Sequence, residues 1–503
     1  MKNDAFLFKT KKPETSLLFG YVSYSLIGLI LLSLPLFRTK AIPIIDNLFT
    51  TISAISTTGL TTVSISDSYS FLGQIVILIL IQLGGIGYMT FGSFIILSSS
   101  INLSNHREEI HKSAFSLPKD FNMKKFIRSI VIYTLFIEFV GTLLLLPAFW
   151  HDLRVNELWS AVFHSVSAFC TAGFSLYNNS FESYAKNGYL NVIIFILSFL
   201  GAIGYIVMVD VWLLIKGKKT KITFTSKIIL FTTCSLLFLG GFLLFLESYF
   251  HYGYQSESVI YSIFQSMTAL TTVGFNTIPI AELSSFSLFI LLILMIIGAS
   301  PSGTGGGIKS TTISSILGII SSVFSYNKEY INYQLPSPDN SNNLLESEKP
   351  LSLRLIDSMK IFNLKASKSR NINKKTTNNR SVDLEKTLGD IFKIKLMNNI
   401  VPFDRIIHAM ATFSFYFIIL FAGTLALLST EPFHLEKIFF EAASALGTVG
   451  LSTGITPSLS LFGKIIIIIL MFIGRLGPIS FGVFLFSRKK KKVIGNTYED
   501  IVI

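Results

Sequence analysis

Long apolar stretches recur along the chain and are separated by polar segments. They fall near residues 17–37, 70–98, 126–149, 187–215, 227–249, 285–324, 404–429 and 461–487. A helix needs about 20 apolar residues to cross the ~30 Å hydrocarbon layer of a membrane, so each stretch is long enough to span it. The pattern therefore predicts eight membrane-spanning segments.

A shorter apolar segment lies between the two members of each successive pair of spans. These segments cover residues 46–56, 157–169, 257–270 and 435–446. At about 1.5 Å per residue, a helix of this length reaches only about halfway across the membrane. A single segment of this kind would be explained as well by an interfacial or buried helix. Four in the same position predict four repeats of span, half-length helix and span.

Every half-length segment ends in a turn of small residues built around one glycine. The four turns read Thr57-Thr58-Gly59-Leu60, Thr171-Ala172-Gly173-Phe174, Thr272-Val273-Gly274-Phe275 and Thr448-Val449-Gly450-Leu451. Glycine suits these turns because consecutive carbonyls can point at one axis only in backbone conformations that are closed to bulkier side chains. Lipid cannot satisfy the peptide groups of such turns, so they must line a space enclosed by protein or filled with water. We interpret the four turns as a ring of carbonyls that binds a dehydrated cation.

The composition agrees with an integral membrane protein. Only 14% of the 503 residues are charged and 50% are hydrophobic, whereas a soluble domain holds about 25% charged residues. The net charge of +13 does not indicate nucleic-acid binding, because the basic residues lie in short clusters between apolar spans. The positive-inside rule places both termini and the loops between repeats in the cytoplasm, so the glycine turns face outside. Acidic residues such as Asp67 and Glu182 then fall on the outer side, where they either concentrate cations or form an ordinary solvated rim.

The chain divides into four repeats and one insert. Repeats are predicted over residues 1–100, 101–220, 221–325 and 402–487, with an insert at 326–401 and a cytoplasmic C-terminal tail at 488–503. The insert is rich in Asn, Ser, Lys and Pro, which predicts a flexible cytoplasmic segment. Within it, residues Asp383 to Met397 are compatible with an amphipathic helix.

A glycine-rich segment interrupts the second span of the third repeat, between Gly298 and Lys309. It contains Pro301 and the glycines Gly303, Gly305, Gly306 and Gly307. This composition cannot continue a helix, and the broken backbone must face a polar cavity. A phosphate-binding loop is not indicated, because Ile308 stands where that motif requires glycine before the lysine and no strand precedes it.

Arg475 is the most informative charge, since it lies inside the last apolar span. An arginine there costs at least ~2.5 kcal/mol on insertion scales, so it should face the interior of the bundle or a pore. The alternative is a structural ion pair with Glu441 or Glu138. Glu441 itself is expected to hydrogen-bond amides near the fourth turn.

Other polar residues in the apolar segments are expected to have structural roles. Gln82, His164 and His408 are predicted to be satisfied polar groups of the core, and Asp210 a solvated residue at the end of the fourth span.

This organisation resembles the Trk/Ktr/HKT superfamily of potassium transporters, and within it the Ktr-type membrane subunit. The stretches that carry the resemblance are Thr272-Val-Gly-Phe-Asn-Thr277, Gly447-Thr-Val-Gly-Leu-Ser-Thr-Gly454, Leu83-Gly-Gly-Ile-Gly87 and Leu200-Gly-Ala-Ile-Gly204. The resemblance implies an all-α membrane fold of four pseudo-fourfold helix, pore-helix and helix repeats around one central pore. It also implies a selectivity filter with one glycine per repeat, namely Gly59, Gly173, Gly274 and Gly450. In some plant relatives a serine replaces the first of these glycines and accompanies sodium transport, so Gly59 implies potassium here.

The same resemblance implies further roles and partners. The glycine-rich segment would be a gate beneath the filter, and Arg475 an electrostatic barrier to ion passage. The family is expected to form homodimers in the cell membrane that dock on a separate cytosolic ring of nucleotide-binding regulatory subunits.

The predicted function is potassium uptake, with a sodium-selective or sodium-coupled cation transporter as the alternative. A sodium-coupled carrier of an organic solute would also use broken helices, but four half-length helices favour a pore. An enzyme such as a membrane ATPase is not indicated, because the sequence offers no phosphate loop, metal-ligand cluster or nucleophile with a base. No cofactor is predicted beyond the transported K⁺, and a role for Na⁺ as a coupling or activating ion stays open.

Overall fold

The computed structural model describes residues 13–87, 123–150, 156–252, 256–332, 395–396, 399–401, 403–477 and 481–482. These residues belong to two compact units. The larger unit comprises Met1–Ser310 and Phe415–Ile503, and the smaller comprises Thr311–Ser414.

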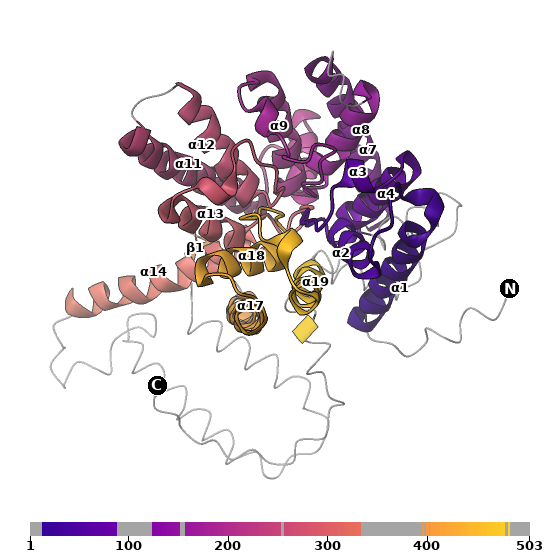
Figure 1. Cartoon of the computed structure of the whole chain (residues 1–503). Helices are drawn as coiled ribbons and strands as arrows, with labels where there is room; N and C mark the ends of the chain where they lie inside the picture. The colour runs from indigo at the N-terminus through magenta and orange to yellow at the C-terminus, as the bar shows by residue number, and fades with distance from the viewer. Residues whose placement is uncertain are drawn as a thin grey trace, which may run out of the picture. The chain divides into compact units, whose positions relative to one another are not determined.

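The larger unit repeats one motif four times: a long helix, a short helix and a second helix. The four copies are α1 (Pro13–Ser33), α2 (Ile44–Ile55) and α4 (Phe71–Ile86); α7 (Met123–Phe149), α8 (Glu157–Phe169) and α9 (Gly188–Ile203); α11 (Phe224–Tyr252), α12 (Ser256–Leu270) and α13 (Ser285–Ile297); and α17 (Phe403–Thr430, of which the part from Phe415 lies in this unit), α18 (Leu435–Gly447) and α19 (Leu461–Leu476). In Figure 1 the copies follow one another from indigo α1 and α2 through α8, α9, α12 and α13 to yellow α18 and α19. The predicted all-α membrane fold with pseudo-fourfold repeats is confirmed.

Short elements complete the larger unit. They are α3 (Ile65–Ser68), α10 (Tyr205–Ile215) and the 3-10 turns η1 (Pro35–Phe37), η2 (Glu182–Tyr184), η3 (Ile280–Glu282) and η6 (Thr456–Ser458).

The second helix of every repeat begins with the same type of cap. Its N-cap side chain accepts a hydrogen bond from the amide three residues later, which satisfies one of the free amides at the start of a helix. The four caps are Ser70, Asn187, Ser284 and Ser460. The local sequence thus begins the second helix in the same way in each repeat.

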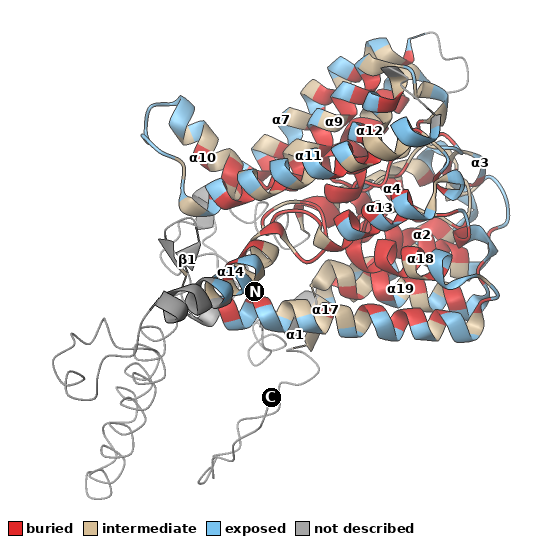
Figure 2. Ribbon diagram, turned by 90° about the vertical axis from the view of Figure 1, so that its left-hand side faces the viewer, coloured by how far each residue is buried: buried red, intermediate tan, exposed pale blue. Residues whose placement is uncertain are grey.

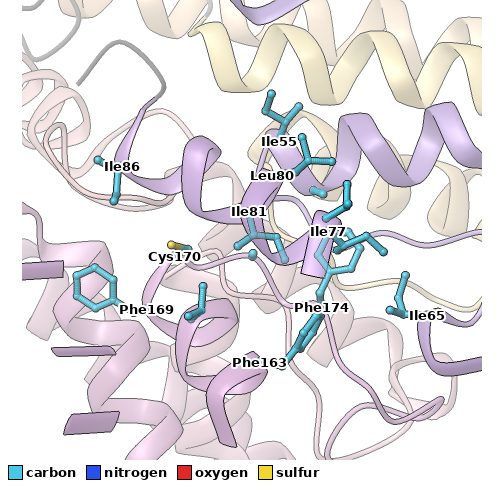
Figure 3. Close-up of a cluster of buried hydrophobic side chains, with 14 of the residues drawn as sticks. Ile55, Ile65, Ile77, Leu80, Ile81, Ile86, Phe163, Phe169, Cys170 and Phe174 are labelled. Carbon is cyan, nitrogen blue, oxygen red and sulfur yellow. The ribbon is translucent and has the colours of Figure 1, made fainter. Parts of the chain in front are cut away.

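Apolar side chains fill the contacts between the short helices and their neighbours. Figure 3 shows one such cluster, in which Ile55 at the end of α2, Ile77 and Ile81 on α4, and Phe163 and Phe169 on α8 lie together. In Figure 2 the buried residues gather where α2, α4, α13 and α18 meet. Large apolar residues on the outer side of the long helices are exposed instead, for example Phe231, Phe238 and Phe250 on α11. An apolar exterior of this kind is suited to lipid.

Within the described residues, the predicted spans do not all form one straight helix. In the same residues, three helices are long and apolar enough to cross a membrane, at Ile127–Phe149, Phe224–His251 and Arg405–Thr430. The predicted span at 187–215 is bent, because α9 and α10 meet at an angle of 100°, and it forms either a broken span or a re-entrant loop. The bend occurs at Gly204, whose φ of +85° is open to glycine and strained for other residues.

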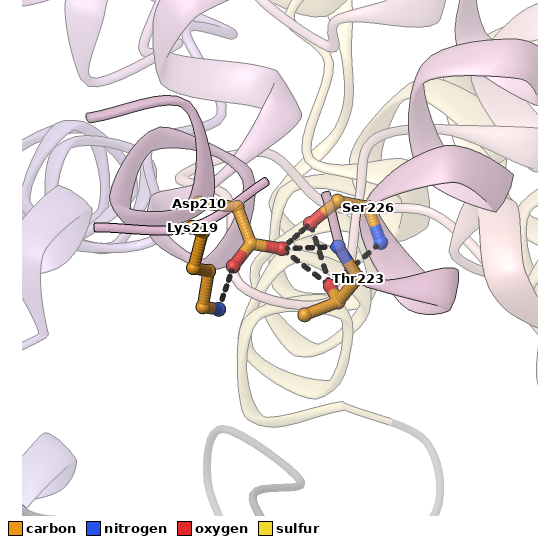
Figure 4. A network of polar contacts seen from close by, with 4 residues as sticks. All are labelled: Asp210, Lys219, Thr223 and Ser226. Atoms are coloured by element: carbon orange, nitrogen blue, oxygen red, sulfur yellow. Dashed lines mark hydrogen bonds and ion pairs between the residues drawn. The ribbon is translucent and has the colours of Figure 1, made fainter. Parts of the chain in front are cut away.

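The prediction that Asp210 is solvated is wrong. Asp210, on α10, is only 4% exposed. Its carboxylate accepts hydrogen bonds from Lys219 Nζ at 2.7 Å, from Ser226 Oγ at 2.6 Å and from both the amide (3.0 Å) and the hydroxyl of Thr223 (Figure 4). The lysine-rich turn folds back over the carboxylate, so Asp210 fixes the end of α10 to the start of α11.

The smaller unit contains most of α14 (Ser310–Asn332) and a hairpin of two short strands, β1 (Lys395–Leu396) and β2 (Asn399–Ile400). Lys395 and Leu396 pair with Ile400 and Asn399, so the prediction of a helix at Asp383–Met397 is wrong at these two residues. The rest of that segment lies outside the described residues. His408 on α17 is exposed, which contradicts its prediction as a core residue.

Candidate functional site

All four glycine turns have the same backbone. Thr57, Thr171, Thr272 and Thr448 adopt left-handed φ angles of 53°, 50°, 58° and 49°, and the glycines two residues later have φ of 93°, 65°, 81° and 94°. The amide of each threonine donates to the carbonyl three residues back. The amide of the next residue donates to the carbonyl five residues back, at 2.8–3.1 Å. This is the Schellman ending of a helix, which usually carries glycine where these turns have threonine.

The four turns form a closed ring. A Cβ placed on Gly59 would lie 2.5 Å from the carbonyl oxygen of Ala172 in the second turn. In the same way Gly173 backs onto the carbonyl of Val273, Gly274 onto that of Val449, and Gly450 onto that of Thr58. Each glycine therefore touches the carbonyl that precedes the next glycine, and the fourth turn returns to the first. No side chain fits between neighbouring turns.

The helices around the four turns also pack in a closed ring. The second helix of each repeat packs on the short helix of its own repeat and on that of the next: α4 on α8, α9 on α12, α13 on α18 and α19 on α2. Polar pairs join two of these junctions at equivalent positions. Lys464 on α19 forms a 2.7 Å ion pair with Asp46 on α2, and Trp159 on α8 donates a 2.7 Å hydrogen bond to Gln74 on α4.

The glycine-rich segment between α13 and α14 lies directly against the turns. Thr171 Oγ1 bonds Thr304 Oγ1 at 3.1 Å, and the amide of Gly306 donates to Thr272 Oγ1 at 2.9 Å. A Cβ on Gly306 would collide with Thr448 Oγ1, so the segment also packs on the fourth turn. Its backbone is fixed to α9, because the amides of Ser300 and Thr304 donate to carbonyls of that helix at 3.1 Å.

Arg475 reaches the remaining turn. Its guanidinium donates to Thr57 Oγ1 at 3.0 Å, to the carbonyl of Thr304 at 2.5 Å and to the carbonyl of Gly84. Its contacts in the described part of the chain are thus with carbonyls and one hydroxyl, and neither Glu441 nor Glu138 is among them. The ion-pair alternative for Arg475 therefore finds no support in the geometry.

The carboxylates near the turns have other partners. Glu138 accepts a 2.9 Å hydrogen bond from Gln82. Glu441 accepts hydrogen bonds from the hydroxyls of Ser452, at 3.0 Å, and Thr456. Glu441 therefore braces the chain after the fourth turn through these hydroxyl groups, and it also interacts with the backbone amide of Thr453, in line with the predicted bond to amides near that turn. The predictions of Gln82 and His164 as satisfied polar groups are confirmed.

Lys309 is a residue of this site that the sequence reasoning missed. Its ammonium donates to the carbonyls of Gly305 at 2.6 Å and Gly306 at 3.3 Å, and its φ is +83°. The lysine thus folds back over its own segment. A lysine that directly follows a glycine-rich break inside an apolar span was the available indication.

Outside the ring, loops of neighbouring repeats join through carboxylates. Asn178 donates to Asp67 at 3.0 Å, and Asn276 donates to Glu182 at 2.8 Å. Hydrogen bonds from Asn178 and from Ser64 lower the pKa of Asp67 below 3.8, whereas burial raises the pKa of Glu182. These two carboxylates hold loops together and are not merely a solvated rim.

Comparisons with known proteins agree with this arrangement. The model of a family described as TrkH, cation transport protein, matches residues 19–492. The Ktr system potassium uptake protein B of Bacillus subtilis (strain 168) is 30% identical over 96% of this chain and 94% of its own length. The Ktr system potassium uptake protein D of the same organism is 31% identical over 96% and 95%. The crystal structure of the potassium transporter TrkH from Vibrio parahaemolyticus superposes with a TM-score of 0.64 at 18% identity, over 96% of this chain and 86% of that one, and shows the same fold. The chain therefore belongs to the TrkH family of cation transport proteins.

Proposed function

We propose that this protein takes up potassium across the cell membrane through one pore, with the ring of four glycine turns as its selectivity filter. The observation that carries the proposal is the closed ring, in which every glycine touches the carbonyl before the next glycine. A ring of backbone carbonyls can replace the hydration shell of a bare cation. Potassium is the ion in the names of the two Bacillus subtilis relatives, and Gly59 in the first turn agrees with potassium.

The filter residues in this proposal are the ones that form the ring. They are Thr58 and Gly59, Thr171 to Gly173, Thr272 to Gly274, and Thr448 to Gly450, and K⁺ would bind their carbonyls. The names of the two Bacillus subtilis relatives do not favour the alternative of a sodium-selective or sodium-coupled transporter.

The gate in this proposal is the glycine-rich segment with Arg475. Gly303, Gly305, Gly306 and Gly307 give it a backbone that can pack against the turns, and contacts with three of the four left-handed threonines support this role. Arg475 donates to Thr57, the remaining left-handed threonine, and to the carbonyl of Thr304 in the segment itself. Its positive charge would therefore oppose the passage of a cation. An ion would cross only when the segment moves aside.

The names of the relatives as parts of a Ktr system support a subunit of a larger assembly. We expect a homodimer that docks on a separate cytosolic ring of nucleotide-binding regulatory subunits. The basic clusters between spans support a cytoplasmic position for both termini.

The test is uptake in cells that lack their own potassium transporters. Expression of the chain should restore growth on low-potassium medium, and repeating the assay with and without sodium shows whether Na⁺ couples or activates transport. The matched control is Cys234→Ser, which changes an exposed side chain outside the ring and should rescue equally well. Failure of the expressed, membrane-inserted chain to restore growth or to carry Rb⁺ in liposomes would refute the proposal.

A further inference from the structure

One position of the short helices carries a polar residue in all four repeats, seven residues before the left-handed threonine. The residues are Thr50, His164, Gln265 and Glu441, and each is at most 2% exposed. Seven residues make about two helical turns, so this position lies on the same side of the helix as the turn that ends it. The four residue types differ, and for this reason no motif reveals the position in the sequence.

In the second repeat the position is held by a neutral imidazole. His164 Nδ1 lies 2.8 Å from the carbonyl of Ser160, so Nδ1 carries the proton and donates it there. Nε2 is then free to accept, and it lies 3.1 Å from Ser175 Oγ and 3.3 Å from the amide of Leu176. Ser175 and Leu176 directly follow the turn residues Gly173 and Phe174.

The third and fourth repeats make the same connection with other groups. Gln265 Nε2 donates to Thr277 Oγ1 at 3.3 Å, three residues after Gly274. Glu441 accepts from Ser452 Oγ at 3.0 Å, two residues after Gly450. In the first repeat the side chain is the short Thr50, and its hydroxyl makes no hydrogen bond to the described residues that directly follow Gly59.

A second position, four residues before the left-handed threonine, also bonds residues of the turn. It carries a hydroxyl in every repeat: Ser53, Ser167, Thr268 and Ser444. Ser53 and Ser444 each accept a 3.1 Å hydrogen bond from the turn glycine, and Ser167 donates to the carbonyl of Phe174 at 2.8 Å. Among the described residues Thr268 Oγ1 makes no such bond, so each position connects the helix to the turn or to the chain after it in three of the four repeats.

A buried polar side chain costs free energy unless it is bonded, and an apolar residue would fill the same space without that cost. We infer that His164, Gln265 and Glu441 are positioning residues, which hold the chain after each turn and so set the spacing of the carbonyl ring and its preference for K⁺ over Na⁺. This inference rests on the proposed function, because it assigns the residues to the filter. None of them touches the ion; they act through the backbone that does.

The experiment compares His164→Gln with His164→Leu in purified protein reconstituted into liposomes. Rb⁺ and Na⁺ fluxes are measured for equal amounts of protein that elute as one species. Glutamine keeps a group that can bond Ser175, so the Rb⁺/Na⁺ ratio should stay near that of the unaltered chain. Leucine removes the bond, and the ratio should fall by about tenfold, the change that corresponds to one hydrogen bond. Ser165→Ala is the matched control, because its hydroxyl donates to the carbonyl of Glu138 and not to the turn, and it should leave the ratio unchanged.

A folded His164→Leu protein that keeps the original ratio would overturn the inference, as would equal loss of both fluxes in the glutamine and leucine variants. If His164→Leu does not fold, Gln265→Met decides with the same readout, and failure of both to fold would assign the position to stability alone. Failure of the proposed function would look different, since the unaltered chain would then carry neither ion.

Discussion

The junction between the fourth and the first repeat must close the ring with residues 418 positions apart in the sequence, Asp46 and Lys464. Their side chains are 7% and 14% exposed, and their charged atoms lie 2.7 Å apart. With an effective dielectric constant of about 20, the attraction at this distance is about 6 kcal/mol before desolvation is subtracted. Removing one partner leaves the other charge buried and unpaired, which costs about 3–5 kcal/mol. We therefore expect Asp46→Asn or Lys464→Met alone to destabilise the protein strongly.

The assay is thermal unfolding of the purified protein in detergent. Each single variant should lower Tm by roughly 3–5 °C, since a chain of this size has a large unfolding entropy. The double variant should lose much less than the sum of the two, because no unpaired charge remains. Exchange of the two charges, Asp46→Lys with Lys464→Asp, should recover part of the stability.

The matched control is the ion pair of Lys186 and Glu257, at 3.1 Å, whose side chains are 78% and 40% exposed. Exposed pairs contribute little, so Lys186→Met should leave Tm unchanged within error. Additive effects of the Asp46 and Lys464 variants, or single variants as stable as the control, would show that the pair does not hold the ring closed.

Three further variants test the proposed filter and gate. Gly59→Ser places a side chain against the carbonyl of the second turn, so it should weaken discrimination against sodium in a Rb⁺/Na⁺ flux assay; unchanged preference would argue against a filter role for Gly59. Arg475→Ala removes the charge beneath the turns and should raise flux or loosen gating, whereas loss of folding without any gain of flux would leave Arg475 a structural residue. Thr272→Gly keeps the left-handed turn, for which glycine is the usual residue, but leaves the amide of Gly306 without its acceptor, at a cost of about 1–3 kcal/mol. Flux should rise with the Rb⁺/Na⁺ ratio unchanged, and an altered ratio with constant flux would contradict the gate role of that contact.

Much of the fold could be predicted from the sequence because the membrane imposes it. Length and hydrophobicity identify helices in lipid, and the four small-residue turns have nearly the same letters and spacing. The bend at Gly204 could not be predicted in this way, since a straight and a bent pair of apolar helices have the same pattern. Asp210 was misjudged for a related reason: its partner Lys219 lies nine residues away, across a turn whose direction no local pattern gives.

The candidate site was predictable only in part. Residue identity shows the turns, the glycine-rich segment and the unusual charge of Arg475, but the partners of that charge are mainly backbone carbonyls, which every residue has. The positions of His164, Gln265 and Glu441 emerge only after the four turns are aligned by their left-handed threonines.

Those threonines connect the two proposed functions of the site. Glycine would end each short helix more easily, because a left-handed φ strains a residue with a Cβ. Threonine in its place supplies a hydroxyl, and three of the four hydroxyls bond the glycine-rich segment or Arg475. The segment consequently cannot leave the turns without breaking bonds to the residues that also fix the carbonyl ring. A movement that opens the proposed gate must therefore change the restraints on the proposed filter, and the strained threonines are the physical link between them.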